Sequence, residues 1–150
     1  MIAPSQKKLF VTWDEVEKHI KTLSLTLRQK GSWDKLVCIT RGGLVPASLL
    51  SHSLNIKYID TLCLTSYDNQ TTQQGIVSVL KEVRDNASST LVIDDLVDSG
   101  QTFVLAHQML PNAHMACVYA KPNGIAFVDS YVASIPQETW IVFPWEVDEC

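Results

Sequence analysis

The sequence predicts an α/β fold with a doubly wound, mainly parallel sheet. Short apolar stretches rich in β-branched residues alternate with stretches whose apolar residues recur at helical spacing, and no internal repeat, low-complexity tract or linker breaks the alternation. Strands that alternate with helices form mainly parallel sheets covered by helices. The 150 residues and the 46% hydrophobic content suit one globular domain over residues 1–150.

The first half of the chain supplies two predicted helices and two predicted strands. The capping box Thr12-Trp13-Asp14-Glu15 begins a helix that runs to about Lys30. One face of this helix is apolar at helical spacing and comprises Val16, Ile20, Leu23 and Leu27. The apolar stretches at 35–40 and 57–67 predict strands, and the stretch at 46–54, which opens with proline, predicts a helix between them.

The second half begins with a polar, nearly uncharged stretch at 68–78, which predicts a flexible loop or hairpin tip. Further strands are predicted at 78–83, 91–93 and 113–120, and the tail at 127–145 contains short strand-like pieces. A helix at 101–110 ends before Pro111. In doubly wound sheets, ligands bind outside the carboxyl ends of the strands. The loops after Thr40 and Ile93 are therefore the expected binding loops.

Composition excludes several classes of function. The formal net charge is -4 and the basic residues are dispersed, which argues against a non-specific nucleic-acid binder but not against a small phosphorylated ligand. No apolar run approaches the length of a membrane span and no targeting segment appears, so we expect a cytoplasmic protein. Cys38, Cys63 and Cys117 lie in apolar runs and predict buried free thiols. The dispersed histidines argue against a zinc site.

The segment LVIDDLVDSGQT, from Leu91 to Thr102, predicts a phosphate site. A buried strand ends in Asp94 and Asp95, and a hydroxyl-rich turn containing Gly100 then opens a helix, whose N-terminal end favours an anion. Paired carboxylates beside a phosphate would repel it unless they hold hydroxyls or a divalent cation. The expected ligand therefore carries a phosphate and a diol and comes with Mg²⁺. The alternative, an ordinary helix cap beside two solvated acids, would suffice for the DSG tripeptide alone.

This segment resembles the phosphoribosyl pyrophosphate (PRPP) signature of type I phosphoribosyltransferases. The stretches TRGGLVPASLL, DTLCLTSYD, YAKPNG and IPQETWIVFPWE resemble, in order and spacing, the bacterial xanthine-guanine phosphoribosyltransferases over about 11–146. The resemblance implies the type I phosphoribosyltransferase fold, with a flexible hood loop at 68–78 and a small base-binding C-terminal region. It implies a purine-salvage homotetramer that uses Mg²⁺ and transfers 5-phosphoribosyl from PRPP to N9 of guanine or xanthine, and of hypoxanthine more weakly. The products would be GMP or XMP and pyrophosphate.

The resemblance also assigns the PRPP site. Asp94 and Asp95 hold the ribose hydroxyls and Mg²⁺, with Asp95 as the metal ligand, and Asp98 assists proton movement at the purine N7, so these three are the expected catalytic residues. The full PRPP set is Arg41, Gly42, Asp94, Asp95, Leu96, Val97, Asp98, Ser99, Gly100, Gln101 and Thr102. Arg41-Gly42 resembles the pyrophosphate loop, which in relatives often carries a cis peptide before the glycine. By itself, Arg41-Gly42-Gly43 could be a simple turn.

Purine recognition is expected from Asp98, Lys121, Trp140 and Ile141. By the resemblance, the Lys121 ammonium donates to the purine O6, which favours 6-oxopurines over adenine. Trp140 stacks on the ring, and backbone carbonyls around Ile141 accept from the edge of guanine or xanthine. A lone lysine at a strand end is usually solvated and a tryptophan near a proline is usually core, so only the matched order AKP…TWI supports these roles. Trp145 is expected to be structural.

The sequence departs from its relatives at two places. The hood lacks the basic residue that relatives use for pyrophosphate, so either pyrophosphate binding is weaker or Lys81 or Arg84 replaces that residue. Gln101 and Ser99 stand where relatives have glycine and threonine. Two alternatives stay open: a PRPP-sensing regulator that binds nucleic acid, and an enzyme for another base such as hypoxanthine. Some relatives associate loosely with the inner membrane, so a peripheral association at its inner face is a further expectation.

Overall fold

The central sheet of the computed structural model, which describes residues 6–67, 76–83 and 89–146, has the strand order β4-β3-β2-β5-β6-β7. Its strands are β2 (Lys35–Thr40), β3 (Tyr58–Tyr67), β4 (Ile76–Lys81), β5 (Thr90–Val97), β6 (His114–Ala120) and β7 (Ala133–Ser134). Only β4 is antiparallel to its neighbour. The predicted mainly parallel sheet is confirmed.

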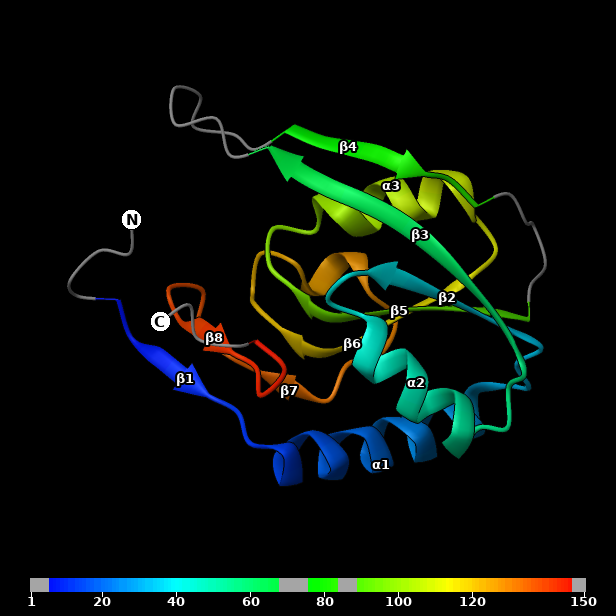
Figure 1. Cartoon of the computed structure of the whole chain (residues 1–150), viewed down its shortest axis with the longest axis horizontal. Helices are drawn as coiled ribbons and strands as arrows, with labels where there is room; N and C mark the ends of the chain where they lie inside the picture. The colour runs from blue at the N-terminus through cyan, green and yellow to red at the C-terminus, as the bar shows by residue number, and fades with distance from the viewer. Residues whose placement is uncertain (1–5, 68–75, 84–88, 147–150) are drawn as a thin grey trace.

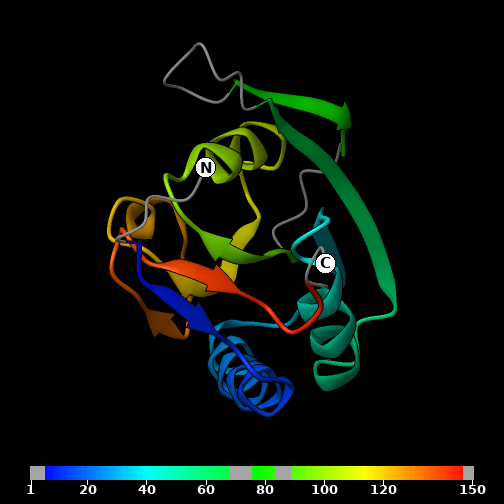
Figure 2. The same cartoon turned by 60° about the vertical axis from the view of Figure 1, so that its left-hand side comes forward.

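Helices cover both faces of this sheet (Figures 1 and 2). The helices α1 (Trp13–Lys30) and α2 (Leu44–Ser53) lie on one face, and α3 (Gln101–Met109) lies on the other. The strand β2 shows why two cores form: Leu36 and Cys38 pack into one cluster, whereas Val37 and Ile39 pack into the other. Successive side chains of a strand point to opposite faces, so a strand buried on both sides is apolar throughout. The fold is therefore doubly wound, as expected.

The predicted helices form with small shifts in their boundaries. At the start of α1, the Thr12 hydroxyl accepts a hydrogen bond from the Glu15 N–H at 3.2 Å, which confirms the predicted cap. The helix α2 begins at Leu44 rather than at Pro46. Pro46 then lies in the first turn, where the N–H groups lack helical partners and a proline costs little.

The strand β5 is longer than predicted, and this is a correction. The sequence predicted a strand at 91–93 that ends in two acids, but β5 continues to Val97. It pairs with β2 only as far as Ile93, whereas its pairing with β6 continues to Val97 opposite Ala120. The partner strand β6 thus extends β5 beyond its apolar segment. As a result, Asp94 and Asp95 lie on the part of β5 that follows the end of its pairing with β2.

A second, two-stranded sheet joins the two ends of the chain. Its N-terminal strand was not predicted from the sequence. The strands β1 (Lys8–Phe10) and β8 (Trp140–Val142) pair in parallel, with Leu9 opposite Ile141. This small sheet lies on the side to which the carboxyl ends of β2, β5 and β6 point (Figures 1 and 2). In the described ranges, no helix is both long enough and apolar enough to cross a membrane.

Candidate active site

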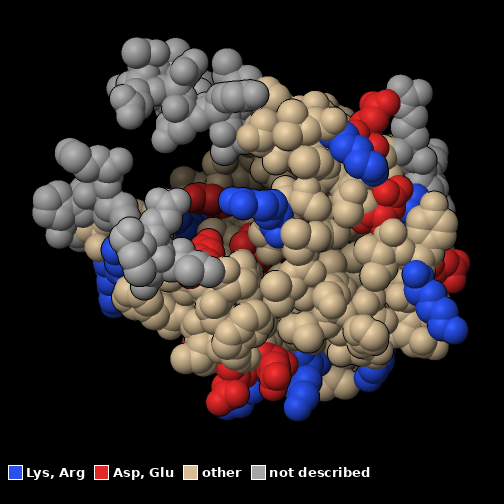
Figure 3. All heavy atoms as spheres, viewed as in Figure 1, with Lys and Arg blue, Asp and Glu red and all other residues tan. Residues whose placement is uncertain are grey.

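The carboxyl ends of β2 and β5 mark the point where the connections of the sheet diverge. From β2 the chain passes to α2 on one face, and from β5 it passes to α3 on the other face. Such a divergence opens a crevice between the two strand ends. Figure 3 shows a hollow on this side of the molecule where acidic and basic side chains gather. The two loops singled out from the sequence, after Thr40 and after Ile93, therefore meet here.

Two adjoining cavities occupy the crevice, and both are lined by Gly42 and Asp95. One has a volume of about 190 Å³ and is also lined by Thr40, Asp94 and Thr102. The other has a volume of about 710 Å³ and is also lined by Arg41, Leu44, Val45, Trp145 and Glu146. The structure thus brings together residues from β2, β5, α3 and the C-terminal segment. Together the cavities are large enough for a phosphorylated sugar.

Asp94 and Asp95, called here the acid pair, are adjacent carboxylates in a poorly solvated place. Burial raises the pKa of Asp94 well above its usual range, and the charge of Asp95 raises it further. Burial also raises the pKa of Asp95, against hydrogen bonds that lower it. The Asp95 N–H donates to Asp94 Oδ1 at 2.8 Å. Without a cation or a hydroxyl partner, the pair therefore favours retaining a proton.

The loop after β2 lies directly against the acid pair. The peptide bond between Thr40 and Arg41 is cis, one bond before the Arg41-Gly42 dipeptide in which a cis bond was expected. A Cβ placed on Gly42 would lie 2.6 Å from Asp95 Oδ1, and one on Gly43 would lie 2.6 Å from the Ile93 carbonyl. Only glycine allows this close approach of two backbone segments. Gly42 and Gly43 thus let this turn pass directly against Asp95 and the Ile93 carbonyl.

Residues 98–102, which the sequence predicts to hold a phosphate, form the turn and the first residues of α3. They line a small cavity of about 100 Å³ together with Leu96, Val97 and Phe103. Gly100 has φ 90°, in the left-handed region, and a Cβ there would overlap the Phe127 ring. The side chains of Ser99 and Gln101 are exposed. The free N–H groups of the first helical turn and the turn glycine make this loop suitable for an anion.

Lys121 and Asp98 meet at the ends of the neighbouring strands β5 and β6. The Lys121 ammonium donates to Asp98 Oδ2 at 3.3 Å, and its side chain is only 6% exposed, against 57% for Asp98. The interpretation of Lys121 as a solvated strand-end lysine is thus wrong. A buried ammonium needs a partner, and here the carboxylate supplies it.

Gln137, from the segment between β7 and β8, also binds Asp98, and the sequence analysis missed it. Its Nε2 donates to Asp98 Oδ1 at 2.6 Å. A glutamine in a loop carries no chemical signature, and the contact spans 39 positions of the chain. Only its place in the IPQETW stretch could have drawn attention to it.

Trp140 and Ile141 lie on β8 at the edge of this region. Trp140 is 47% exposed, whereas Ile141 is buried in the core. The N–H of Trp140 and the carbonyl of Val142 bond to the segment around β1. Backbone groups alternate sides along a strand, so those of Ile141 face away from β1. Trp145 stacks on Phe143 at 4.6 Å, in keeping with a structural role, and it also lines the larger cavity.

The expected contacts from the hood lie largely outside the described residues. Residues 68–75 and Arg84 are not described, while residues 76–78 belong to β4. The Lys81 ammonium donates to Asp60 Oδ1 at 3.0 Å and to the Thr61 carbonyl at 2.7 Å. Two of the three N–H donors of Lys81 are therefore engaged with β3.

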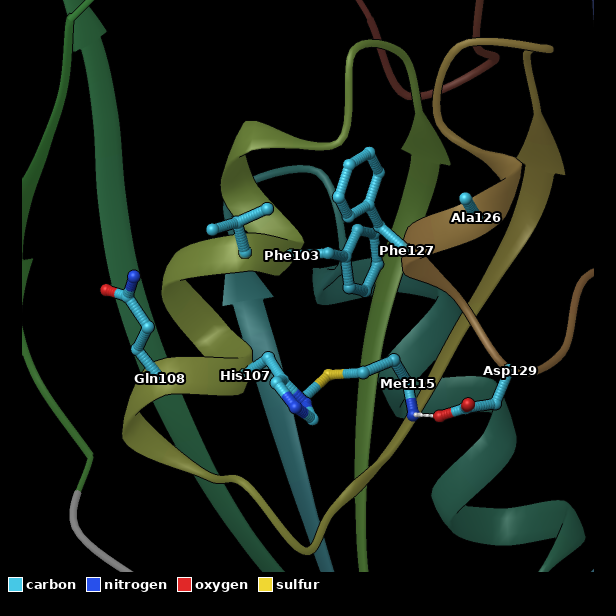
Figure 4. Close-up of a pocket in the computed structure, with 8 residues that line it drawn as sticks. Phe103, His107, Gln108, Met115, Ala126, Phe127 and Asp129 are labelled. Carbon is cyan, nitrogen blue, oxygen red and sulfur yellow. Dashed lines mark hydrogen bonds between the residues drawn. The ribbon is translucent and has the colours of Figure 1, made fainter.

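A further cavity, of about 390 Å³, lies between α3, β6 and the 3-10 helix η1 (Ile125–Phe127), as Figure 4 shows. Its walls are largely apolar and include Phe103, Met115 and Phe127. The Asp129 carboxylate beside it accepts a hydrogen bond from the Met115 N–H at 2.8 Å. None of the residues predicted for the site lines this cavity. Phe127 packs against Gly100, in the loop at the start of α3.

Known proteins share both the sequence pattern and the fold. Residues 10–149 match the family described as Phosphoribosyl transferase domain. A purine phosphoribosyltransferase from Pyrococcus horikoshii is 28% identical, with a TM-score of 0.81 over 96% of this chain and 97% of that chain. A xanthine-guanine-hypoxanthine phosphoribosyltransferase from Helicobacter pylori is 24% identical, with a TM-score of 0.76 over 94% and 95%.

A third similar structure is a hypoxanthine phosphoribosyltransferase mutant from Trypanosoma cruzi complexed with the product IMP. It is 21% identical, with a TM-score of 0.65 over 89% of this chain and 79% of that chain. The family match spans almost the whole chain and includes both loops of the crevice. The chain belongs to the type I phosphoribosyltransferase family.

Proposed function

We propose that this protein transfers the 5-phosphoribosyl group of PRPP to N9 of guanine or xanthine, and of hypoxanthine more weakly. The products are GMP or XMP and pyrophosphate, and the process is purine salvage. One observation carries the proposal: the acid pair lies between a glycine loop and a helix-start cradle, while a buried lysine paired with Asp98 lies at the next strand end. Phosphate, ribose and base can therefore each meet suitable groups.

In this proposal PRPP lies across the crevice. The N–H groups of residues 98–102, with the Ser99 and Thr102 hydroxyls, hold the 5-phosphate. Asp94 and Asp95 accept hydrogen bonds from the ribose hydroxyls, and Arg41 and Gly42 contact the pyrophosphate. The glycine turn supports this arrangement because it places the loop after β2 directly against Asp95.

The acid pair also fits Mg²⁺. Two buried carboxylates whose pKa values are raised by burial gain from a cation that favours their ionised forms. Among the residues that the structure describes, no third His, Cys, Asp or Glu completes a protein cage. Mg²⁺ is commonly held by one or two carboxylates and substrate oxygens, so Asp95 with PRPP is a suitable set. When bound, the ion stabilises negative charge on the leaving pyrophosphate.

The transfer needs no protein nucleophile. Purine N9 forms a bond to C1′ as the bond from C1′ to the pyrophosphate oxygen breaks, through a transition state with positive charge on the sugar. In this proposal the carboxylates of the acid pair stabilise that charge. Asp98 takes up the proton released from the imidazole edge of the base, and its position beside Lys121 supports this role.

Base choice is assigned to Lys121, Trp140 and Ile141. Lys121 donates to the purine O6, Trp140 stacks on the ring, and the outward backbone carbonyl of Ile141 accepts from the opposite edge. Adenine presents a donor at the position of O6, so the ammonium disfavours it. The burial of Lys121 supports a specific contact, since a buried ammonium with one weak partner gains from a second.

The resemblance further suggests a cytoplasmic homotetramer. Exposed apolar side chains on β3 and β4 support assembly, namely Tyr58, Ile59, Val79 and Leu80. Light scattering coupled to size exclusion tests it, and a monomer at micromolar concentration would refute it.

The test of function is pyrophosphate release from PRPP with Mg²⁺ and guanine, xanthine, hypoxanthine or adenine. We expect turnover with guanine and xanthine, less with hypoxanthine and none with adenine. Turnover with hypoxanthine alone would refute the base assignment. No turnover with any base, in a protein that still binds PRPP, would refute the enzyme and favour a PRPP-binding regulator.

A further inference from the structure

Gln137 bridges two parts of the site that are far apart in the chain. Its Nε2 donates to Asp98 Oδ1 at 2.6 Å, and its Oε1 accepts from the Asn123 N–H at 2.9 Å. A backbone N–H can only donate and an ionised carboxylate can only accept. One orientation of the amide satisfies both partners, so the network itself fixes which end faces Asp98.

The bridge closes a ring of contacts around Asp98. Lys121 donates to Asp98 Oδ2 at 3.3 Å, so each carboxylate oxygen has its own donor. Asn123 lies in the same turn as Lys121, and the Gly124 N–H donates to the Lys121 carbonyl at 2.9 Å. The two donors to Asp98 are therefore held by one turn. A carboxylate that is 57% exposed would otherwise rotate freely.

The same contact links the cradle to the segment that carries the base residues. Gln137 precedes Trp140 by three positions, and a tight turn between Pro136 and Thr139 joins them. Any shift of this segment moves the amide, and with it the orientation of Asp98. A neutral amide suits this position because it orients the Asp98 carboxylate without adding a second charged group that would compete with Asp98 for the purine proton.

We propose that Gln137 is a positioning residue that fixes the Asp98 carboxylate against the imidazole edge of the purine, an inference that rests on the proposed function. Gln137 does not contact the reacting atoms itself. It affects the purine through Asp98, and its loss should not affect the 5-phosphate and pyrophosphate sites. Its loss should therefore lower kcat and raise the purine KM while the PRPP KM stays the same.

The test uses steady-state kinetics of the full chain with guanine and PRPP varied in turn. Gln137→Met keeps the volume but removes both hydrogen bonds, and we expect kcat/KM for guanine to fall about 10- to 100-fold, the range for a lost bond to a charged group. Gln137→Glu faces Asp98 with a second carboxylate, and we expect a larger loss. Glu138→Gln, at the next position and exposed, is the matched control and should keep full activity.

A double-mutant cycle separates positioning from a structural role. If Gln137 acts through Asp98, Gln137→Met should cost nothing further in the Asp98→Asn background, and both variants should melt within a few degrees of the unaltered protein. Full guanine activity of Gln137→Met, a PRPP KM that rises equally, or an undiminished effect in the Asp98→Asn background would overturn the inference alone. An unaltered protein without turnover on any base would overturn the proposed function first, and this inference with it.

Discussion

Two carboxylate sites, the acid pair and Asp98, lie within four positions of each other in the chain and differ in burial and in hydrogen bonding. The acid pair is held by the strand β5, is poorly solvated, and has pKa values raised by burial. Asp98 is more exposed, and each of its oxygens has a donor from elsewhere in the chain. In the first site burial disfavours the ionised carboxylates, whereas in the second each carboxylate oxygen accepts a side-chain hydrogen bond. The difference suggests that the acid pair binds a cation and hydroxyls, while Asp98 acts by its orientation.

Replacing the carboxylates should cause the greatest loss of activity and should separate these two roles. Replacing Asp94 and Asp95 together by asparagine should remove both PRPP binding and detectable turnover, a loss of more than about 10³-fold, because the ribose and Mg²⁺ lose their ligands. Asp98→Asn should lower turnover about 10²- to 10⁴-fold and leave PRPP binding intact, as expected for a proton acceptor. Calorimetry with PRPP and Mg²⁺, together with pyrophosphate release, measures both. Retained turnover in the double variant would contradict the assignment of the acid pair.

A second prediction tests the geometry of the acid pair without changing its charge. In Gly42→Ala the new methyl group would lie 2.6 Å from Asp95 Oδ1, so Asp95 or the loop has to move. We expect kcat/KM for PRPP to fall about 100-fold, as for a misplacement of about 1 Å.

The matched control is Gly31→Ala, whose methyl group would meet only the Trp33 ring at 3.7 Å. Its PRPP kinetics should match those of the unaltered protein. An equal loss in both variants would indicate a general effect on folding rather than on Asp95.

The third prediction concerns the partner of Asp98. Lys121→Met preserves the buried stem but removes the proposed donor to the purine O6, so kcat/KM for guanine should fall about 10- to 100-fold. The PRPP KM should stay unchanged, because the acid pair is independent of this contact. Competition between guanine and adenine shows whether discrimination weakens, and unchanged discrimination would exclude Lys121 as the determinant.

The last prediction concerns how the free energy of unfolding depends on pH, and we expect this change to be modest. It is measured in the presence of a chelator, so that no Mg²⁺ is bound. The folded pKa of Asp94 lies well above its ordinary value of 3.8, so between these values the folded protein binds more protons than the unfolded chain. The free energy of unfolding should therefore fall as the pH rises from about 4 through the raised pKa, by at most about 1.4 kcal/mol per unit for each group.

The double asparagine variant provides the comparison for this pH effect. In this variant, the free energy of unfolding should lack the pH dependence that comes from the acid pair. At neutral pH the variant should be more stable than the unaltered protein. Urea unfolding at several pH values measures the difference, and identical slopes in the two proteins would show that the acid pair is not desolvated.

Much of the fold was predictable because it follows from local patterns. Local sequence patterns predicted the Thr12 cap, the apolar face of α1 and the apolar runs of β2 and β6. A periodicity of 3.6 or 2 in the apolar residues indicates which faces of an element are buried. The extension of β5 to Val97 was missed because β6, rather than the β5 sequence, determines where the pairing ends. The strand β1 was missed because three residues carry no period, and its partner β8 lies more than a hundred positions away.

The type of chemistry could be recognised from residue types and spacing: adjacent acids at a strand end, a hydroxyl-rich glycine turn at a helix start, and a lysine after another strand. Which of these groups meet depends on the folded chain. It placed Gly42 against Asp95, buried Lys121 beside Asp98 and brought in Gln137 from 39 positions away. The physical reason is that residue type and local spacing set the capacity to bind or to donate. Burial, and with it the pKa and the choice of partner, depends on segments that become neighbours only when the sheet is assembled.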